Sequence, residues 1–318
     1  MAGSGIGLAL GSGAARGWAH IGILRALTQA GIVPDVIAGT SIGAVVGGCF
    51  AAARLDELEG FARDLTRRKV FGFLDFNLSG SGLITGQRVV ERLENHLKKD
   101  LIEKLHTRFV AVATELGTGH EIWLSRGSLI EAMRASYAIP GIFKPVRFDG
   151  RWLFDGALVN PVPVSVCRAL GARYVIAVNL NADLGGRGTV IADRDVTRDI
   201  GHAATIDVSV EPESNGRSAR KLLQRQLFGG GESGPGISTV MLDAFNIVQD
   251  RIARSRLAGD PPDAMINPRL AGIGLFDFHR ADDLIQQGMA AAQRAIPELR
   301  RELGCDRAKL PVRLAPVA

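Results

Sequence analysis

The chain has 318 residues, of which 46% are hydrophobic and 22% charged, enough for one large globular domain with an ample core. Its net charge of +5 leaves room for an anionic membrane as a partner, and we expect no nucleic-acid partner. No apolar run approaches the roughly 20 residues of a membrane-spanning helix, and no basic segment precedes the first apolar run, so we expect no secretory signal.

Segments typical of strands and helices alternate from the start of the chain. A strand at 5–11 precedes an amphipathic helix at 18–31, and a second strand at 35–39 precedes an apolar helix at 41–53. Later strands are expected at 108–116, 121–125, 172–180 and 263–268, with helices at 163–171, 237–257 and 280–303. This alternation predicts an α/β fold with a mostly parallel sheet covered by helices.

Residues 183–236 interrupt this alternation. They hold ten glycines and fifteen charged residues with little periodicity, which predicts a flexible insertion. The helix that follows repeats apolar residues on one face, namely Met241, Phe245, Val248 and Ile252. We therefore expect a single domain over 5–305, with the insertion inside it and a C-terminal tail at 306–318.

The second strand-to-helix turn, "GTSIG", holds a serine between two glycines. Ser41 lies between the apolar strand and the apolar helix, where a sharp reversal forces the central residue into a strained conformation. Side chains two positions before and after it would collide, and Gly39 and Gly43 remove those collisions. The pattern fits a nucleophile elbow and equally a tight connection with an incidental serine, so the motif alone does not decide between them.

The first strand-to-helix turn, "LGSGAARGWAHIG", is built from small residues whose backbone N–H groups can surround an anion. Its candidate residues are Gly11, Ser12, Gly13, Ala14, Arg16 and Gly17. The anion would be either a bound phosphate or the oxyanion of acyl transfer. The dinucleotide pattern fits poorly, because Gly17 comes one position late and Asp35 opens the second strand instead of closing it. Arg16 is expected to brace the loop through backbone carbonyls.

A serine nucleophile needs a base, and none of the six histidines has the neighbours of a catalytic histidine. A stronger candidate is Asp155, which ends a strand-like run and is followed by Gly156 and Ala157. A carboxylate at a strand end, followed by a turn of small residues, could approach Ser41 directly. The alternative is an ordinary Asp-Gly turn.

Three stretches, "GSGAARG", "GTSIG" and "DGA", stand in the order found in the patatin-like phospholipases. Residues 135–146, 160–164 and 251–263 are also similar to the bacterial branch related to the catalytic domain of neuropathy target esterase. The resemblance implies a three-layer α/β/α patatin-like fold and hydrolysis of phospholipid, lysophospholipid or simple esters through an acyl-enzyme. We expect no cofactor, and no calcium or other metal, because no acidic cluster has the spacing of a calcium loop.

By the same resemblance Ser41 is the nucleophile and Asp155 the general base of a Ser-Asp dyad, and the glycine loop supplies the oxyanion hole. The chain has Ser12 and Ala14 where many members have an unbroken glycine run. Two alternatives from other classes remain: a catalytically weak regulatory or binding protein, and a nucleotide-binding oxidoreductase built on the glycine loop.

Two segments suggest contact with a membrane. Residues 66–86 combine basic and aromatic side chains in the manner of an interfacial lid, although a core-packing connector is equally compatible. Residues 217–228 alternate basic and apolar side chains like a short interfacial helix. The three cysteines lie far apart without metal-ligand spacing, which indicates a reduced compartment and hence a cytoplasmic or peripheral membrane protein.

Overall fold

A mostly parallel, eight-stranded sheet forms the centre of the computed structural model, which describes residues 5–66, 100–182 and 237–304. The parallel strands are β1 (Ile6–Leu10), β2 (Val36–Thr40), β3 (Arg108–Glu115), β7 (Tyr174–Val178) and β8 (Ala264–Ile266). The antiparallel strands are β4 (Glu121–Leu124) and β6 (Arg151–Asp155), which pair with β3, and β5 (Val146–Phe148), which pairs with β6. The order β5-β6-β3-β2-β1-β7-β8 leaves β1 and β2 in the middle.

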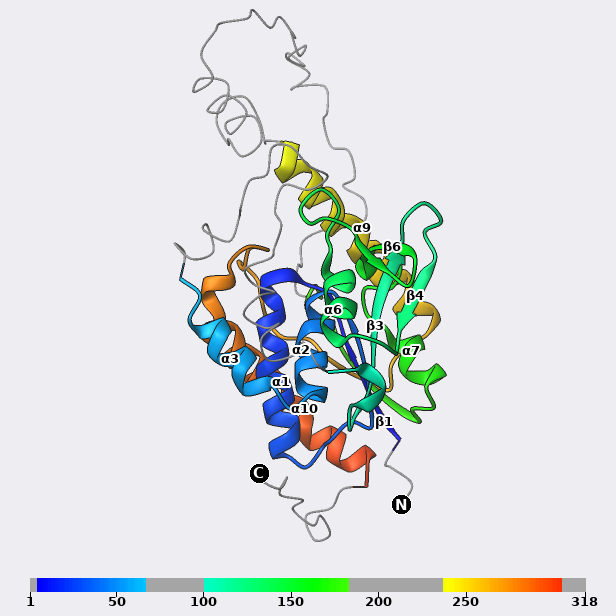
Figure 1. Cartoon of the computed structure of the whole chain (residues 1–318). Helices are drawn as coiled ribbons and strands as arrows, with labels where there is room; N and C mark the ends of the chain where they lie inside the picture. Colours follow the sequence, from blue (N-terminus) through cyan, green and yellow to red (C-terminus); the bar gives the residue numbers. More distant parts are fainter. Residues whose placement is uncertain (1–4, 67–99, 183–236, 305–318) are drawn as a thin grey trace, which may run out of the picture. The chain divides into compact units, whose positions relative to one another are not determined.

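Helices cover both faces of the sheet (Figure 1). The helices of one core cluster are α1 (Ala19–Gln29), α2 (Ile42–Ala51), α3 (Leu55–Arg63), α6 (Leu129–Tyr137) and α10 (Ala281–Glu302). Those of the other are α7 (Val164–Ala169) and the later part of α9 (Ile237–Gly259). The predicted α/β/α arrangement is therefore confirmed.

The central strands are apolar on both sides because each side packs against a helix layer. In β1, Leu8 and Leu10 belong to the core cluster of α1 and α2, whereas Ala9 belongs to the cluster of α7. Every residue of β1 and β2 is buried, which explains why these strands show no polar alternation in the sequence. Their carboxyl ends meet at one edge of the sheet.

The N-terminal helix α1 and the C-terminal helix α10 pack with their backbones in close contact. A Cβ atom added to Gly22 would lie 1.9 Å from the carbonyl oxygen of Ile285, and one added to Gly288 would lie 1.9 Å from that of Ala19. Only glycine fits at either position, so the two ends of the described chain are joined by a contact that tolerates no side chain.

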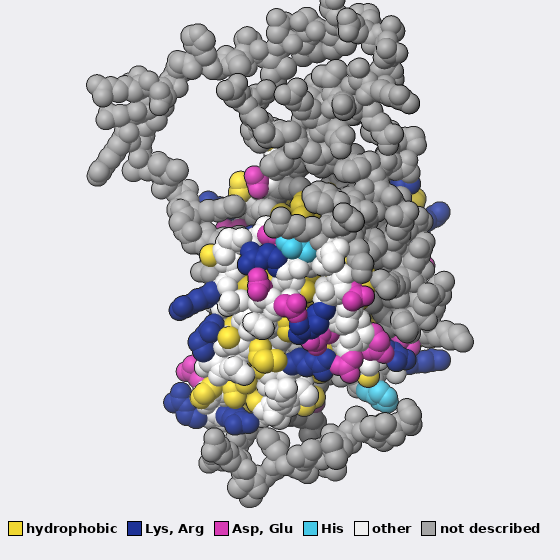
Figure 2. Space-filling model, turned by 90° about the vertical axis from the view of Figure 1, so that its left-hand side faces the viewer, with side chains coloured by type: hydrophobic (Ala, Val, Ile, Leu, Met, Phe, Trp, Pro, Cys, Tyr) yellow, Lys and Arg dark blue, Asp and Glu magenta, His cyan; other side chains and the backbone are white. Residues whose placement is uncertain are grey.

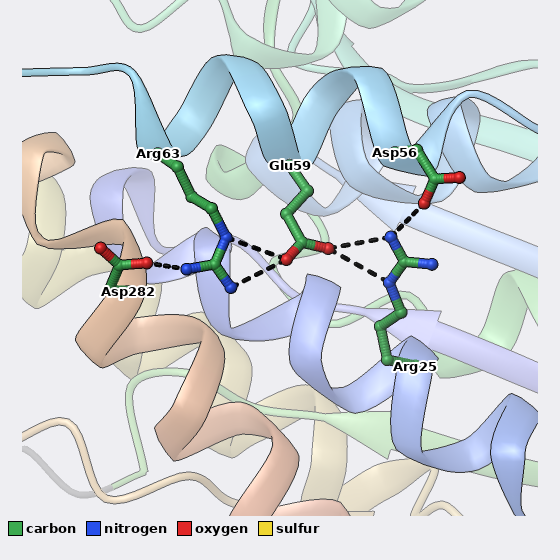
Figure 3. A network of polar contacts seen from close by, with 5 residues as sticks. All are labelled: Arg25, Asp56, Glu59, Arg63 and Asp282. Atoms are coloured by element: carbon green, nitrogen blue, oxygen red, sulfur yellow. Dashed lines mark hydrogen bonds and ion pairs between the residues drawn. The ribbon is translucent and has the colours of Figure 1, made fainter.

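An ion-pair network fastens α3 to both of these helices (Figure 3). Glu59 accepts hydrogen bonds from Arg25 of α1 at 2.9 Å and from Arg63 at 2.8 Å. Arg25 also pairs with Asp56, and Arg63 with Asp282 of α10. Figure 2 shows this side of the molecule, where basic and acidic side chains are interspersed.

The structure differs from the sequence predictions at several elements. The strands and helices expected at the positions of β1 to β4, β7, β8, α1, α2, α7, α9 and α10 are present, whereas α3, α6 and β5 were not predicted. The prediction that the apolar residues of α9 face the core is wrong. Val248 is 42% exposed, and among the α9 side chains that the structure describes the buried ones are Asn246, Gln249 and Ala253. The predictions for 66–86 and 217–228, for the insertion at 183–236 and for the tail at 306–318 fall almost entirely outside the described residues.

Candidate active site

Ser41 occupies a sharp turn between β2 and α2. Its backbone has φ 58° and ψ −124°, a left-handed conformation that side chains rarely adopt. The flanking glycines are required by close approach, since a Cβ atom on Gly39 would lie 2.5 Å from the carbonyl oxygen of Gly43. One on Gly43 would lie 2.2 Å from that of Leu10. The turn therefore has the strained strand-to-helix geometry that the sequence predicts.

Asp155 lies beside Ser41 although 114 residues separate them in the sequence. Val112 of β3 pairs with Thr40 of β2, and Asp155 of β6 pairs with Ala113 of β3, so the sheet register carries the carboxylate to the end of β2. The Oγ atom of Ser41 donates a hydrogen bond of 2.6 Å to Oδ2 of Asp155. The two side chains that the sequence singles out are thus direct partners.

The carboxylate of Asp155 is completely buried, and burial raises its pKa from 3.8 to about 7. Hydrogen bonds from Ser41 and from the backbone N–H of Ala157 act in the opposite direction and are outweighed. A Cβ atom on Gly156 would lie 2.2 Å from the carbonyl oxygen of Val112. The glycine after Asp155 therefore lets the carboxylate sit tightly against β3.

Buried hydroxyl groups hold the backbone around the pair. The Oγ atom of Ser136 accepts a hydrogen bond of 2.9 Å from the N–H of Ser41 and donates one of 2.6 Å to the carbonyl of Val112. Thr114 donates from Oγ1 to the carbonyl of Asp155 at 2.8 Å. Sequence reasoning missed Ser136, and a polar residue on an otherwise apolar helix face was the only available signal.

The glycine loop continues from β1 into a short 3-10 helix, η1 (Ala14–Trp18). The N–H groups of Gly11 and Ser12 donate to carbonyls of neighbouring segments, and that of Arg16 donates to the carbonyl of Gly13. Within the described part of the chain, by contrast, no hydrogen bond from the N–H of Gly13 or Ala14 is found. Of the candidate oxyanion-hole residues, these two therefore have N–H groups without an acceptor among the described residues.

The loop lies against the start of α2. A Cβ atom on Gly17 would lie 2.1 Å from Cγ1 of Ile42, the residue after the serine. Ala14 has φ 49°, a left-handed conformation that is costly for a residue with a side chain. The small residues of "GSGAARG" thus bring the loop next to Ser41.

Arg16 braces the loop, as its position in a turn predicts. Its Nε and Nη2 atoms donate to the carbonyl of Ile273 at 3.1 and 2.9 Å, and Nη1 donates to Oδ1 of Asn181 at 3.0 Å. The guanidinium is buried, with the residue 6% exposed. The buried guanidinium therefore connects the loop to the segment that precedes α10.

A second support comes from the buried polar face of α9. Ser12 donates from Oγ to Oε1 of Gln249 at 2.8 Å, and Gln249 donates from Nε2 to Oδ1 of Asn246 at 2.7 Å. Ser12 of the glycine loop is therefore bonded to α9. This explains why amide side chains, and not apolar ones, face inward there.

None of the histidines that the structure describes hydrogen-bonds to Ser41. His20 is buried, its Nε2 lies 2.8 Å from the carbonyl oxygen of Gly11, and its Nδ1 has no partner among the described residues. Burial lowers the pKa of His20 to about 4, although the bond to Gly11 opposes that shift, so the ring is neutral near pH 7. His106 and His120 are exposed. In residues 5–66, 100–182 and 237–304 no group of three potential metal ligands is found, and no helix is long and apolar enough to cross a bilayer.

Comparisons with known proteins show which family the sequence belongs to. The family model for patatin-like phospholipase matches residues 8–168, which include both turns and Asp155. The uncharacterized NTE family protein Rv1063c of Mycobacterium tuberculosis is 35% identical over 328 residues, covering 92% of this chain and 91% of that protein. A second mycobacterial NTE family protein, Rv2565, is 31% identical over 93% of this chain and 47% of its own length.

Patatin-like phospholipase domain-containing protein 7 of Rattus norvegicus is 34% identical over 189 residues, which are 57% of this chain and 14% of that protein. The shared region extends across bacterial and animal proteins with these names, and supports lipid hydrolysis as the general activity. The chain belongs to the patatin-like phospholipase family.

Proposed function

We propose that the protein is a serine acyl hydrolase that cleaves carboxylic ester bonds of lipids, with Ser41 as nucleophile and Asp155 as general base. The observation that carries the proposal is the 2.6 Å hydrogen bond between these two buried side chains. The substrate class comprises phospholipids, lysophospholipids and simple esters. Family membership supports lipid hydrolysis in general, and the hydrogen bond supports the specific mechanism.

In the first half-reaction the Oγ atom of Ser41 bonds to the ester carbonyl carbon while its proton passes to Oδ2 of Asp155. The electron pair of the carbonyl double bond moves to the oxygen. The N–H groups of Gly13 and Ala14 are proposed to bind that oxyanion, because they have no acceptor in the part of the chain that the structure describes and lie on the loop beside Ser41. The bond to the leaving alcohol then breaks, and Asp155 returns the proton to the departing oxygen.

In the second half-reaction water replaces the alcohol. Its oxygen attacks the acyl carbon as Asp155 takes a proton, and the bond to Ser41 breaks as that proton returns to Oγ. A free fatty acid leaves and the enzyme is regenerated. A carboxylate with a pKa of about 7 is a far stronger base than one with a pKa of 3.8, which suits proton abstraction from a hydroxyl group near neutral pH.

The test is a hydrolysis screen over p-nitrophenyl esters, lysophospholipids and diacyl phospholipids, combined with labelling by a fluorophosphonate. We expect turnover and labelling in the wild type and neither in Ser41→Ala. Ser255→Ala, at an exposed serine of α9, is the matched control and should behave like the wild type. A folded wild type without turnover or labelling would instead favour a regulatory or binding protein.

A further inference from the structure

Three large apolar side chains lie on one face at the end of the sheet. Trp123 of β4 pairs with Val112 of β3, and residues directly opposite in an antiparallel pair point to the same face. The N–H of Leu116 donates to the carbonyl of Trp152 at 2.8 Å, which continues the pairing of β3 with β6. Because Leu116 is four residues beyond Val112, the strand period of two brings all of these side chains to the face on which Val112 lies.

This part of the face is not covered. Trp152 and Leu116 are each 51% exposed and Trp123 is 43% exposed, whereas Val112 on the same face is buried. The chain has three tryptophans, and the third, Trp18, is buried in the core. Exposed apolar side chains on one face, two of them tryptophans, are typical of an interaction surface. We call Leu116, Trp123 and Trp152 the tryptophan surface.

The tryptophan surface lies at the same edge of the sheet as the proposed dyad. β2 and β3 are parallel, with Thr40 opposite Val112, so Leu116 extends beyond the end of β2 where Ser41 follows. Trp152 stands three residues before Asp155 in β6. Asp155 pairs with Ala113 and therefore points to the face opposite the tryptophan surface, so a bilayer would reach both only across the carboxyl edge of the strands.

The charges around the tryptophan surface favour an anionic partner. The nearby carboxylates are taken up by ion pairs, Glu115 with Arg151 at 3.0 Å and Glu121 with Arg256 at 2.9 Å. Arg147 lies directly opposite Trp152 in the β5–β6 hairpin and is exposed, and no ion pair of Arg147 with another described residue is found.

Lys144 precedes this hairpin and is also exposed without an ion pair to any described residue, against a single exposed carboxylate, Asp149, in the turn. Of these two cations, Arg147 is the one adjacent to an indole ring, that of Trp152, whereas Lys144 lies beside Arg134 and Tyr137 of α6. Basic groups beside aromatic rings match the headgroup region of an anionic bilayer, where an indole buries its ring and keeps its N–H in a polar layer.

We propose that the tryptophan surface docks the protein on an anionic phospholipid membrane, so that the catalytic edge faces the lipid. This inference rests on the proposed function, because a lipid substrate is what makes a bilayer the partner. The two tryptophans enter the headgroup region, and Arg147 contacts lipid phosphates.

The test uses the full chain and vesicles of phosphatidylcholine with phosphatidylglycerol. We expect a blue shift of tryptophan emission on binding and quenching by lipids brominated in the upper acyl chain. Trp123→Ala and Trp152→Ala should each weaken vesicle binding by roughly tenfold, and Arg147→Ser should weaken binding to anionic vesicles more than to neutral ones. Val33→Ser is the matched control, since Val33 is 50% exposed but precedes β2 at the opposite edge.

Turnover of a short, soluble ester separates this inference from the proposed function. The tryptophan variants should keep wild-type turnover of that ester, because neither side chain belongs to the proposed catalytic machinery. Wild-type vesicle affinity in both variants, with that turnover intact, would overturn the docking surface alone. A dimer in solution that the tryptophan substitutions convert to a monomer would assign the surface to a second copy of the chain instead.

Discussion

Replacing the buried carboxyl group by an amide should abolish activity and yet stabilise the protein at neutral pH. Asp155→Asn keeps the size of the side chain and an oxygen that can accept from the N–H of Ala157. It removes the proposed proton acceptor for Ser41, so we expect no measurable turnover of a soluble ester at any pH. It also removes the cost of ionising a carboxyl group that has no access to water.

The size of that cost follows from the pKa of Asp155. Burial raises the pKa from 3.8 to about 7, and a difference of roughly three units corresponds to about 4 kcal/mol. The folded protein holds this proton more tightly than the unfolded chain does. The contribution of this proton to the stability of the fold is therefore fully present below pH 3.8 and is lost as the pH rises through 7.

The assay compares the free energy of unfolding in urea of the wild type and of Asp155→Asn from pH 4 to pH 8. Over this interval the free energy of unfolding of the variant should rise relative to that of the wild type by up to about 4 kcal/mol. Taking the difference cancels the opposite contribution of His20, whose pKa burial lowers to about 4. Asp149→Asn, at an exposed aspartate, is the control and should show no such trend.

The same pKa sets the activity profile of the wild type. Its kcat/KM for a soluble ester should rise about tenfold per pH unit up to pH 7 and then level off, because only the carboxylate form can accept the serine proton. Parallel stability curves for wild type and Asp155→Asn, or full activity at pH 5, would refute the reasoning.

Three further substitutions test the supports of the site. Ser136→Ala leaves the N–H of Ser41 unpaired and should cost about 1–3 kcal/mol in urea unfolding and lower kcat more than it changes KM. Gly17→Ala forces a methyl group onto the start of α2; we expect it to cost about 1–3 kcal/mol by the same measurement and to slow ester turnover. Glu59→Gln breaks the centre of the α3 network and should lower the midpoint of thermal unfolding, with ester turnover unchanged.

Much of the site could be predicted because its chemistry is local. A serine between glycines at a strand-to-helix turn needs no partner elsewhere to be recognised, and the structure gives Ser41 the strained backbone that the letters imply. Asp155 was predictable for a related reason: a carboxylate at the end of an apolar strand, followed by small residues, must lie at a sheet edge. The register that joins the two side chains comes only from the folded sheet.

The parts that could not be predicted depend on contacts between distant segments. Hydrophobic periodicity placed the inward face of α9 on its apolar residues, whereas Asn246 and Gln249 are buried, because Gln249 bonds to both Asn246 and Ser12 of the glycine loop. A residue scale assigns such amides to the surface. The exposure of Trp123 and Trp152 was equally hidden, since an aromatic residue in a strand is expected to be buried.

The contact between α1 and α10 determines when the glycine loop can form during translation. The glycine loop is synthesised before β2, yet its bracing carbonyls at Ile273 and Leu275, and the helix that covers α1, are synthesised after Asp155. A nascent chain that has already made Ser41 and Asp155 still lacks these supports. The glycine loop can therefore take its final shape only after α10 has been synthesised, well after the residues that surround Ser41.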